Sequence, residues 1–133
     1  MTDTPFPSST LREPILRIVP GPTDINANGH IFGGWVLSQM DIAGGIIAGR
    51  VAGGAVATVA IEAMKFIAPI LMRDIVSVYG HVQRRGTTSI AVHLDVVAER
   101  GGSTAPVPLT SGVFTFVAID EHARPRPLPR EAS

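Results

Sequence analysis

A long helical pattern of apolar side chains occupies the first half of the chain. Residues 33–51 contain no proline and place apolar side chains on nearly every side of a helix. A helix that is apolar all round is buried, so we predict a long buried helix over this range. Gly44 and Gly45 each cost roughly 1 kcal/mol against alanine in a helix interior, which indicates close approach by another backbone or a ligand. Gly53 and Gly54 end the helix.

The rest of the chain predicts β-strands separated by turn residues. Apolar and polar residues alternate over Ile75–Gln83 and Ile90–Val96, which gives each strand one buried and one wetter face. Residues 84–87 predict a hairpin that makes the two strands antiparallel neighbours. Three further strand candidates are apolar or β-branched: Leu11–Val19 with its Pro14, Val56–Ile67 and Ser111–Ile119. One buried helix followed by antiparallel strands predicts an α+β domain whose single sheet curls around the helix.

Length and composition favour one domain. A chain of 133 residues can bury a core without disulfides, yet it is small enough that a site would be shared between subunits. We predict a disordered lead-in over 1–10, the domain over 11–120, and a basic proline-rich tail over 121–133. The chain begins without the basic and apolar regions of a secretory signal, and charged residues interrupt its most apolar run. We therefore expect a cytoplasmic protein that does not enter a membrane.

Charge and residue types exclude several functions. With 11 basic and 11 acidic residues the net charge is zero, so the basic excess of a nucleic-acid binder is missing. The absence of cysteine excludes a thiol nucleophile, a disulfide framework and a thiolate metal site. The four histidines show no i,i+4 pair and no acidic neighbour at ligand spacing, so we expect no metal site. The glycine motifs of serine hydrolases, P-loop proteins and dinucleotide-binding folds are also missing.

Asp41 is the only carboxylate within the predicted helix. An ionised carboxylate in apolar surroundings is costly unless it is paired or used, and aspartate has a low helix propensity. It could cap a backbone group or pair with a core cation, or it could act as a partly desolvated general base or nucleophile in a cleft. The preceding turn, Asn28–Gly34, is either an ordinary helix start or a set of free amides that holds an oxyanion. Together the turn and Asp41 favour attack on a carbonyl.

The segment NANGHIFGGWVLSQMDIAGG, residues 26–45, resembles the signature of the hotdog-fold acyl-CoA thioesterases, specifically the bacterial YciA-type group. The resemblance begins near Leu16 and continues through VAIEAMKFIAP (59–69), GTTSI (86–90), VFTFVAID (113–120) and RPRPLPRE (124–131). It implies a hotdog fold, in which an antiparallel sheet wraps around the long central helix. It also implies that two subunits pair into a continuous sheet, that active sites lie at the dimer interface, and that dimers assemble into a hexamer.

The resemblance assigns roles by matching position. Asp41 takes the role of the catalytic carboxylate, and the amides near Gly33 and Gly34 polarise the thioester carbonyl. Asp41 would activate water, or attack directly to give a transient anhydride. Similar chains often carry Asp or Asn at position 30, whereas this chain has His30, which either hydrogen-bonds the water or thioester or merely ends the loop. Asn28 is a second polar candidate in that loop.

Coenzyme A carries a pyrophosphate and a 3′-phosphate, for which arginine is a suitable partner. Thr58 and Glu62 match positions that line the site, although an alternating strand also needs polar residues on one face. Ile46, Met64 and Phe66 would line the acyl pocket or belong to the plain core. The candidates for phosphate contact lie on the hairpin and the tail, and a solvated turn or tail is their alternative reading: Arg84, Arg85, Gly86, Thr87, Thr88, Ser89, Arg124, Arg126 and Arg130.

We therefore expect an acyl-CoA thioesterase that hydrolyses its substrate to free CoA and a carboxylic acid, without a metal or tightly bound cofactor. The expected assembly is a homodimer and a hexamer made of three dimers. The alternative is a non-catalytic acyl-CoA-binding or regulatory hotdog module, which would gain little from a partly desolvated acid near a thioester. A hotdog hydratase acting on enoyl-CoA resembles a different Asp/His arrangement that this sequence lacks. Product analysis separates these functions, because only hydrolysis releases free thiol.

Overall fold

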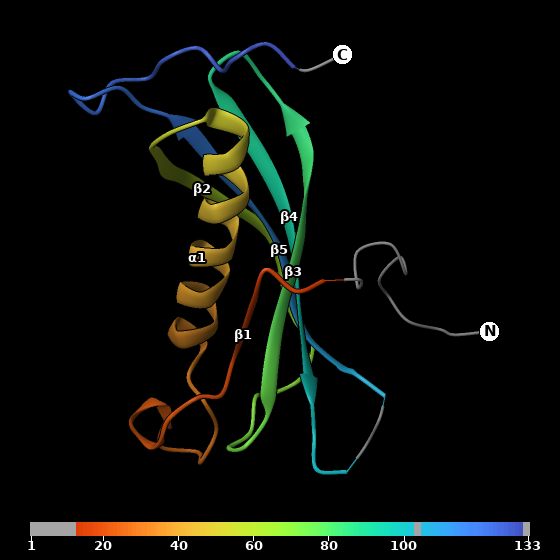
Figure 1. Cartoon of the computed structure of the whole chain (residues 1–133). Helices are drawn as coiled ribbons and strands as arrows, with labels where there is room; N and C mark the ends of the chain where they lie inside the picture. Colours follow the sequence, from red (N-terminus) through yellow and green to blue (C-terminus); the bar gives the residue numbers. More distant parts are fainter. Residues whose placement is uncertain (1–12, 103–104, 132–133) are drawn as a thin grey trace.

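A computed structural model describes residues 13–102 and 105–131, which form one long helix packed against one antiparallel sheet (Figure 1). This confirms the α+β class and the single sheet. The predicted lead-in over 1–10 lies outside the described residues, and the other domain boundaries stay predictions. In chain order the elements are β1 (Leu16–Ile18), the 3₁₀ helix η2 (Pro22–Asp24), α1 (Gly33–Ala52), β2 (Val56–Phe66), β3 (Ile75–Arg85), β4 (Ser89–Glu99) and β5 (Val107–Ala118).

The strands lie in the order β1-β3-β4-β5-β2, and all neighbours are antiparallel. The hairpin joins β3 to β4 as predicted, with His81 opposite His93, but residues 84 and 85 still belong to β3. β5 begins at Val107, earlier than predicted, and so includes Pro108. The register shifts between Val96 and Val97 beside this proline, and such an irregularity tolerates a residue that cannot donate a ladder hydrogen bond. β1 and β2 are the two edges of the sheet.

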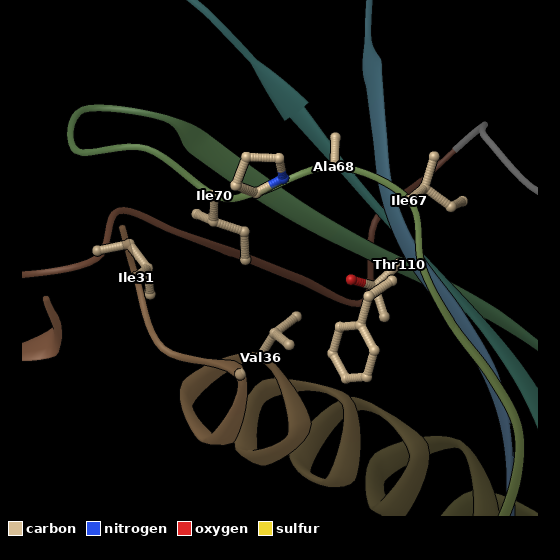
Figure 2. A pocket seen from close by; sticks show the side chains of 9 residues that line it. Ile31, Val36, Ile67, Ala68, Ile70 and Thr110 are labelled. Atoms are coloured by element: carbon tan, nitrogen blue, oxygen red, sulfur yellow. The ribbon is translucent and has the colours of Figure 1, made fainter. Parts of the chain in front are cut away.

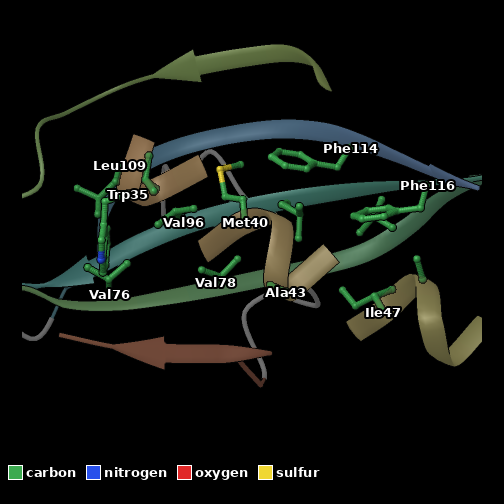
Figure 3. Close-up of a cluster of buried hydrophobic side chains, with 14 of the residues drawn as sticks. Trp35, Met40, Ala43, Ile47, Val76, Val78, Val96, Leu109, Phe114 and Phe116 are labelled. Atoms are coloured by element: carbon green, nitrogen blue, oxygen red, sulfur yellow. The ribbon is translucent and has the colours of Figure 1, made fainter. Parts of the chain in front are cut away.

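The core lies between α1 and the sheet (Figure 3). Met40 and Ala43 of α1 are fully buried, and Phe114 and Phe116 of β5 pack in the same cluster. A Cβ atom on Gly44 would lie 2.8 Å from Cζ of Phe116, so this glycine is required by close packing. The close approach expected at Gly44 is present, but the prediction of a backbone or a ligand as the approaching group is wrong, because the group is the side chain of Phe116.

The C-terminal end of α1 is tied to the tail. Gly53 adopts φ 67° and donates its N–H to the carbonyl oxygen of Gly49 at 2.9 Å, which is a common way to end a helix. Arg126 donates from Nη2 to the carbonyl oxygen of Ala52 at 2.9 Å and from Nε to that of Ile119 at 3.1 Å. One guanidinium therefore joins the last turn of the helix to the chain that follows β5.

One face of α1 and the adjoining edge strand β2 are exposed. Ile42 on α1 is 50% exposed and Phe66 at the end of β2 is 62% exposed; Ile46 and Ile61 are exposed as well. The prediction of a helix buried on nearly every side is therefore wrong for the single chain. The physical reason is that the sheet covers only one side of α1, so the apolar residues on its other side have no cover within the described residues.

Candidate functional site

Asp41 lies on the exposed face of α1, where its Oδ1 accepts a hydrogen bond of 2.5 Å from Oγ1 of Thr58 on β2. No arginine, lysine or histidine forms an ion pair with Asp41 within the described residues. Among those residues, Asp41 therefore pairs with no core cation, and its side chain caps no backbone group. Asp41 is exposed in the single chain, and its partial desolvation stays a prediction. Thr58 thus contacts Asp41, whereas Glu62 is exposed on β2 and its side chain has no partner in the described parts of the chain. That both residues line the site stays a prediction.

The loop before α1 is organised by Asn26. Its Oδ1 accepts hydrogen bonds from the backbone N–H groups of Asn28 at 2.9 Å and His30 at 3.1 Å. Its own N–H donates to the carbonyl oxygen of His30 at 2.6 Å, and Gly29 adopts φ 79° at the tip of the loop. The backbone of His30 therefore closes the loop, which leaves the role of its side chain a prediction. Sequence reasoning overlooked Asn26, although asparagine is favoured where a side chain mimics a backbone turn.

The first amides of α1 are exposed and unpaired. Phe32 precedes the helix with extended backbone angles, and Gly33 and Gly34 are the first two helical residues. Neither glycine N–H has an acceptor within residues 13–102 and 105–131. The first N–H groups of a helix have no acceptor inside the helix, and no side chain caps this end. Such amides carry partial positive charge, so this helix end can bind an oxyanion.

A cavity of about 310 Å³ adjoins this helix end (Figure 2). Val36 of α1 and Thr110 of β5 line it, together with Ile31, with Phe66 at the end of β2, and with residues 67–70 after that strand. Gly33 also lines the cavity, so the unpaired amides and the apolar space are adjacent. Of the three residues expected in an acyl pocket, Phe66 lines this cavity. The other two do not, because Ile46 is exposed on α1 and Met64 packs against the core.

The β3–β4 hairpin holds two arginines with different surroundings. Arg84 is exposed, and its side chain has no partner among the residues that the structure describes. Arg85 donates from Nη2 to the carbonyl oxygen of Pro129, and its Nε lies 3.3 Å from Oε1 of Glu131. The N–H of Gly86 donates to the carbonyl oxygen of Ser89 at 2.8 Å, which closes the turn.

The tail runs beside this hairpin. Leu128 donates its N–H to the carbonyl oxygen of Thr87 at 2.8 Å, and the carbonyl oxygen of Thr88 accepts from the N–H of Ala118 at 2.9 Å. The guanidinium of Arg126 is engaged with the end of α1, as described above. Arg124 and Arg130 are exposed. Sequence reasoning proposed both basic groups but overlooked their contact, and phosphate binding by the nine hairpin and tail residues stays a prediction.

A polar cluster on the other face of the sheet was not found from the sequence. The rings of His81 and His93 stack with centroids 5.2 Å apart, and His93 Nε2 lies 2.9 Å from Oδ1 of Asp95. Asp95 is only 1% exposed, and burial raises its pKa. Burial and the nearby His93 lower the pKa of His81. The strand register brings these residues together, and spacing along the chain does not reveal it.

Two expected absences concern metals and membranes. In the described ranges, no group of three or more histidine, cysteine, aspartate or glutamate side chains could hold a metal ion. Over the same ranges, no helix is both long and apolar enough to cross a bilayer. The lack of a cofactor, the lack of a nucleic-acid partner and the cytoplasmic location stay predictions.

Comparison with known sequences identifies close relatives. The sequence profile of the thioesterase superfamily matches residues 28–105, which include all of α1, β2, β3 and β4. The acyl-CoA thioester hydrolase YciA of Salmonella typhimurium is 44% identical over 121 residues, covering 88% of this chain and 90% of the relative. An uncharacterized acyl-CoA thioester hydrolase of Haemophilus influenzae is 46% identical over 121 residues, covering 88% and 78%.

Solved structures with the same architecture carry related names. A hexameric broad specificity acyl-coenzyme A thioesterase superposes with a TM-score of 0.82 at 45% identity, over 89% of this chain and 82% of that one. A hexameric hotdog fold thioesterase of Campylobacter jejuni superposes with a TM-score of 0.84 at 38% identity, over 88% and 90%. These matches confirm the hotdog fold and the YciA-type resemblance. The chain belongs to the thioesterase superfamily.

Proposed function

We propose that this protein hydrolyses acyl-CoA thioesters, with Asp41 as general base or nucleophile. The observation that carries the proposal is the hydrogen bond from Thr58, which orients an exposed carboxylate on a helix whose first amides are unpaired. The names of the relatives support the substrate class, since acyl-CoA thioester hydrolases share 44% and 46% identity with this chain. Asp41 contributes the reacting carboxylate, and Thr58 holds it in position.

Two routes lead to the same products. In the first, Asp41 takes a proton from water while the water oxygen attacks the thioester carbonyl, and the tetrahedral intermediate expels CoA as a thiolate. In the second, a carboxylate oxygen attacks the carbonyl, CoA leaves, and water then hydrolyses the mixed anhydride. In both routes, negative charge develops on the carbonyl oxygen. The unpaired amides of Gly33 and Gly34 are suited to stabilise that charge, because they are fixed before the reaction begins.

The spacing along α1 requires two subunits for one site. Asp41 follows Gly33 by eight residues, which is about 12 Å at 1.5 Å per residue. A carbonyl must lie about 3 Å from both the oxyanion donors and the attacking group, so these groups of one chain cannot act on the same carbonyl. We therefore propose that Asp41 of one subunit works with the glycine amides of its partner.

The exposed apolar residues support such a pairing. β2 is an edge strand with unpaired backbone groups on one side, and Ile61 and Ile42 are exposed beside Asp41 and Thr58. A long apolar edge invites pairing with another strand. In the proposed homodimer the two β2 strands meet, and the sheet continues across the interface. We further propose a hexamer of three such dimers, since the related thioesterases are hexameric.

The remaining parts of the substrate fit two separate regions. The cavity beside Gly33 would take the acyl chain, because its apolar walls include Val36 and Phe66 and it adjoins the amides that would hold the carbonyl oxygen. The hairpin would take phosphate groups of CoA through Arg84, Arg85 and the amides of Thr87 and Thr88. The N–H of Gly86 is bonded to Ser89. Arg124 and Arg130 would add positive charge from the tail.

Release of free thiol from acyl-CoA tests the proposal. The purified protein is mixed with a panel of acyl-CoAs of short, medium and long chain and one aromatic acyl-CoA, and a thiol-reactive dye follows CoA release. Rapid release for at least one substrate supports hydrolysis, and treatment with a chelator should leave the rate unchanged. Binding of acyl-CoA without thiol release would instead support the alternative, a non-catalytic acyl-CoA-binding module.

A further inference from the structure

Glu131 in the tail pairs with Arg85, and both residues line a second cavity beside the β3–β4 hairpin. A cavity of about 380 Å³ lies between the end of α1, which contributes Val51, and the hairpin, which contributes Arg84 and Arg85. Glu131 is also one of its lining residues, and its carboxylate pairs with Arg85. Figure 1 shows the tail, in blue, passing the tip of the β3–β4 hairpin before the chain ends.

The two members of this ion pair differ in how firmly they are held. Arg85 is 21% exposed and is fixed by a second contact, its hydrogen bond to the carbonyl oxygen of Pro129. Glu131 is 73% exposed, and its carboxylate has no other partner among the described residues. An exposed ion pair contributes little free energy, so a stronger anion can displace Glu131 while Arg85 stays in position.

A phosphate group is such an anion. The guanidinium of arginine binds phosphate as it binds carboxylate. Glu131 occupies the Nε edge of Arg85, and Pro129 occupies Nη2, so a phosphate that binds at Nε must displace Glu131. The tail itself would remain in position during the exchange, because Leu128 is bound to Thr87 through the backbone and Arg126 is bound to the end of α1. Only the side chain of Glu131 needs to move.

We propose that Glu131 is an internal competitor for Arg85, which a phosphate group of CoA displaces when substrate or product binds. The inference rests on the proposed function, in which the hairpin binds these phosphates. The tail then sets the affinity for both acyl-CoA and CoA. A lower affinity for CoA favours release of the product, and it also weakens binding of the substrate.

Calorimetric titration of the full-length protein with CoA tests this inference. Glu131→Gln removes the competing charge and should tighten CoA binding by about two- to fivefold, the range expected for an exposed ion pair. Arg85→Gln should weaken binding. In the double variant the effect of Glu131→Gln should vanish, because the arginine for which it competes is gone.

A matched control and a second ligand sharpen the result. Glu121→Gln removes an acid of the same tail, one whose Oε1 lies 3.5 Å from Nε2 of His122, and should leave CoA affinity unchanged. Dephospho-CoA lacks the 3′-phosphate. Tightening by Glu131→Gln for CoA alone supports the inference and assigns the contact to the 3′-phosphate. Tightening for both ligands supports it and assigns the contact to the pyrophosphate.

Several results would overturn the inference. Glu131→Gln could leave CoA affinity unchanged or weaken it, which would make Glu131 a residue that only positions the tail. If Glu131→Gln raised CoA affinity equally with and without Arg85, the change in overall charge would explain the effect. Failure of the unaltered protein to bind CoA would also overturn it. Thiol release, measured on the same proteins, tests the proposed hydrolysis separately, because CoA titration requires no turnover.

Discussion

Thr58 on the edge strand β2 donates a hydrogen bond of 2.5 Å to Oδ1 of Asp41 on α1. The bond joins two elements whose exposed faces adjoin, and it occupies one oxygen of the carboxylate. The other oxygen, Oδ2, has no hydrogen-bond partner within the described residues. One oxygen is therefore used to orient the group, and the other is available to take a proton from water or to attack a carbonyl.

Replacement of Thr58 tests whether this orientation is used. Thr58→Val keeps the shape of the side chain but removes the donor, and we expect kcat for acyl-CoA hydrolysis to fall about tenfold, since one hydrogen bond to a charged group is lost. Thr58→Ser keeps the hydroxyl and should remain close to the unaltered rate. Steady-state kinetics on all three proteins provide the comparison. Equal rates for the valine and serine variants would show that the bond has no role in turnover.

Mixing of inactive variants tests the shared site. Gly33→Pro removes one oxyanion donor at the first helical position, where proline is well tolerated, and the extended backbone of Phe32 suits a following proline. Asp41→Ala removes the carboxylate. If the two groups act across the dimer, unfolding and refolding the variants together should restore about a quarter of normal activity, because about half of the dimers are mixed and each has one intact site. Activity no higher than that of the separate variants would contradict the shared site.

Gly44 and its neighbour Gly45 form a matched pair for stability. A Cβ atom on Gly44 would lie 2.8 Å from the ring of Phe116 and 3.1 Å from Cδ1 of Leu94, both within the core. We expect Gly44→Ala to lower the free energy of unfolding by about 1–3 kcal/mol through overpacking. Gly45→Ala would place its Cβ at 3.9 Å from the nearest ring atom, so it should be neutral or raise stability by up to about 1 kcal/mol. Urea denaturation measures both, and equal effects would contradict the packing argument.

The polar cluster of His81, His93 and Asp95 predicts that the free energy of unfolding depends on pH. Burial lowers the pKa of His81 below the ordinary value of 6.5, and the neighbouring His93 lowers it further. The unfolded chain then binds more protons than the folded one, so the contribution of His81 is complete above pH 6.5 and is lost as the pH falls below it. Asp95 acts in the opposite direction, because burial raises its pKa and favours the protonated acid at low pH.

Denaturation of the unaltered protein and of His81→Gln between about pH 7.5 and about pH 5.5 isolates the histidine contribution. We expect the free energy of unfolding to fall less in the variant than in the unaltered protein over this range. Identical pH dependence of the two proteins would mean that His81 does not contribute.

The helix and the strands could be predicted where their apolar residues are buried within the single chain. The helix was expected over Gly33–Val51 and is observed over Gly33–Ala52, because its glycines and its lack of proline delimit it. β3 and β4 were predicted by alternation. The second face is not the wetter one that was expected, because Ser77 and Tyr79 of β3 and Asp95 of β4 are buried as well. The exposed apolar face around Ile42 could not be predicted, because a buried position and an interface position look the same in a single sequence.

The site was predictable as residue types but not as contacts. Asp41 stands out as the only carboxylate in an apolar helix, whereas its bond to Thr58 depends on how β2 lies beside α1. The pairing of Arg85 with Glu131 joins residues far apart along the chain, as the tail folds back to the hairpin. The stacking of His81 on His93 depends on strand register, which alternation alone does not specify.

The most direct test of the account compares the unaltered protein with Asp41→Ala and Asp41→Asn. Thiol release is measured from the best acyl-CoA substrate, and CoA binding is measured on the same samples. We predict rapid release that falls roughly a hundredfold or more in both variants, with CoA binding retained. Release at the unaltered rate by either variant would contradict the assignment of Asp41 as the catalytic carboxylate.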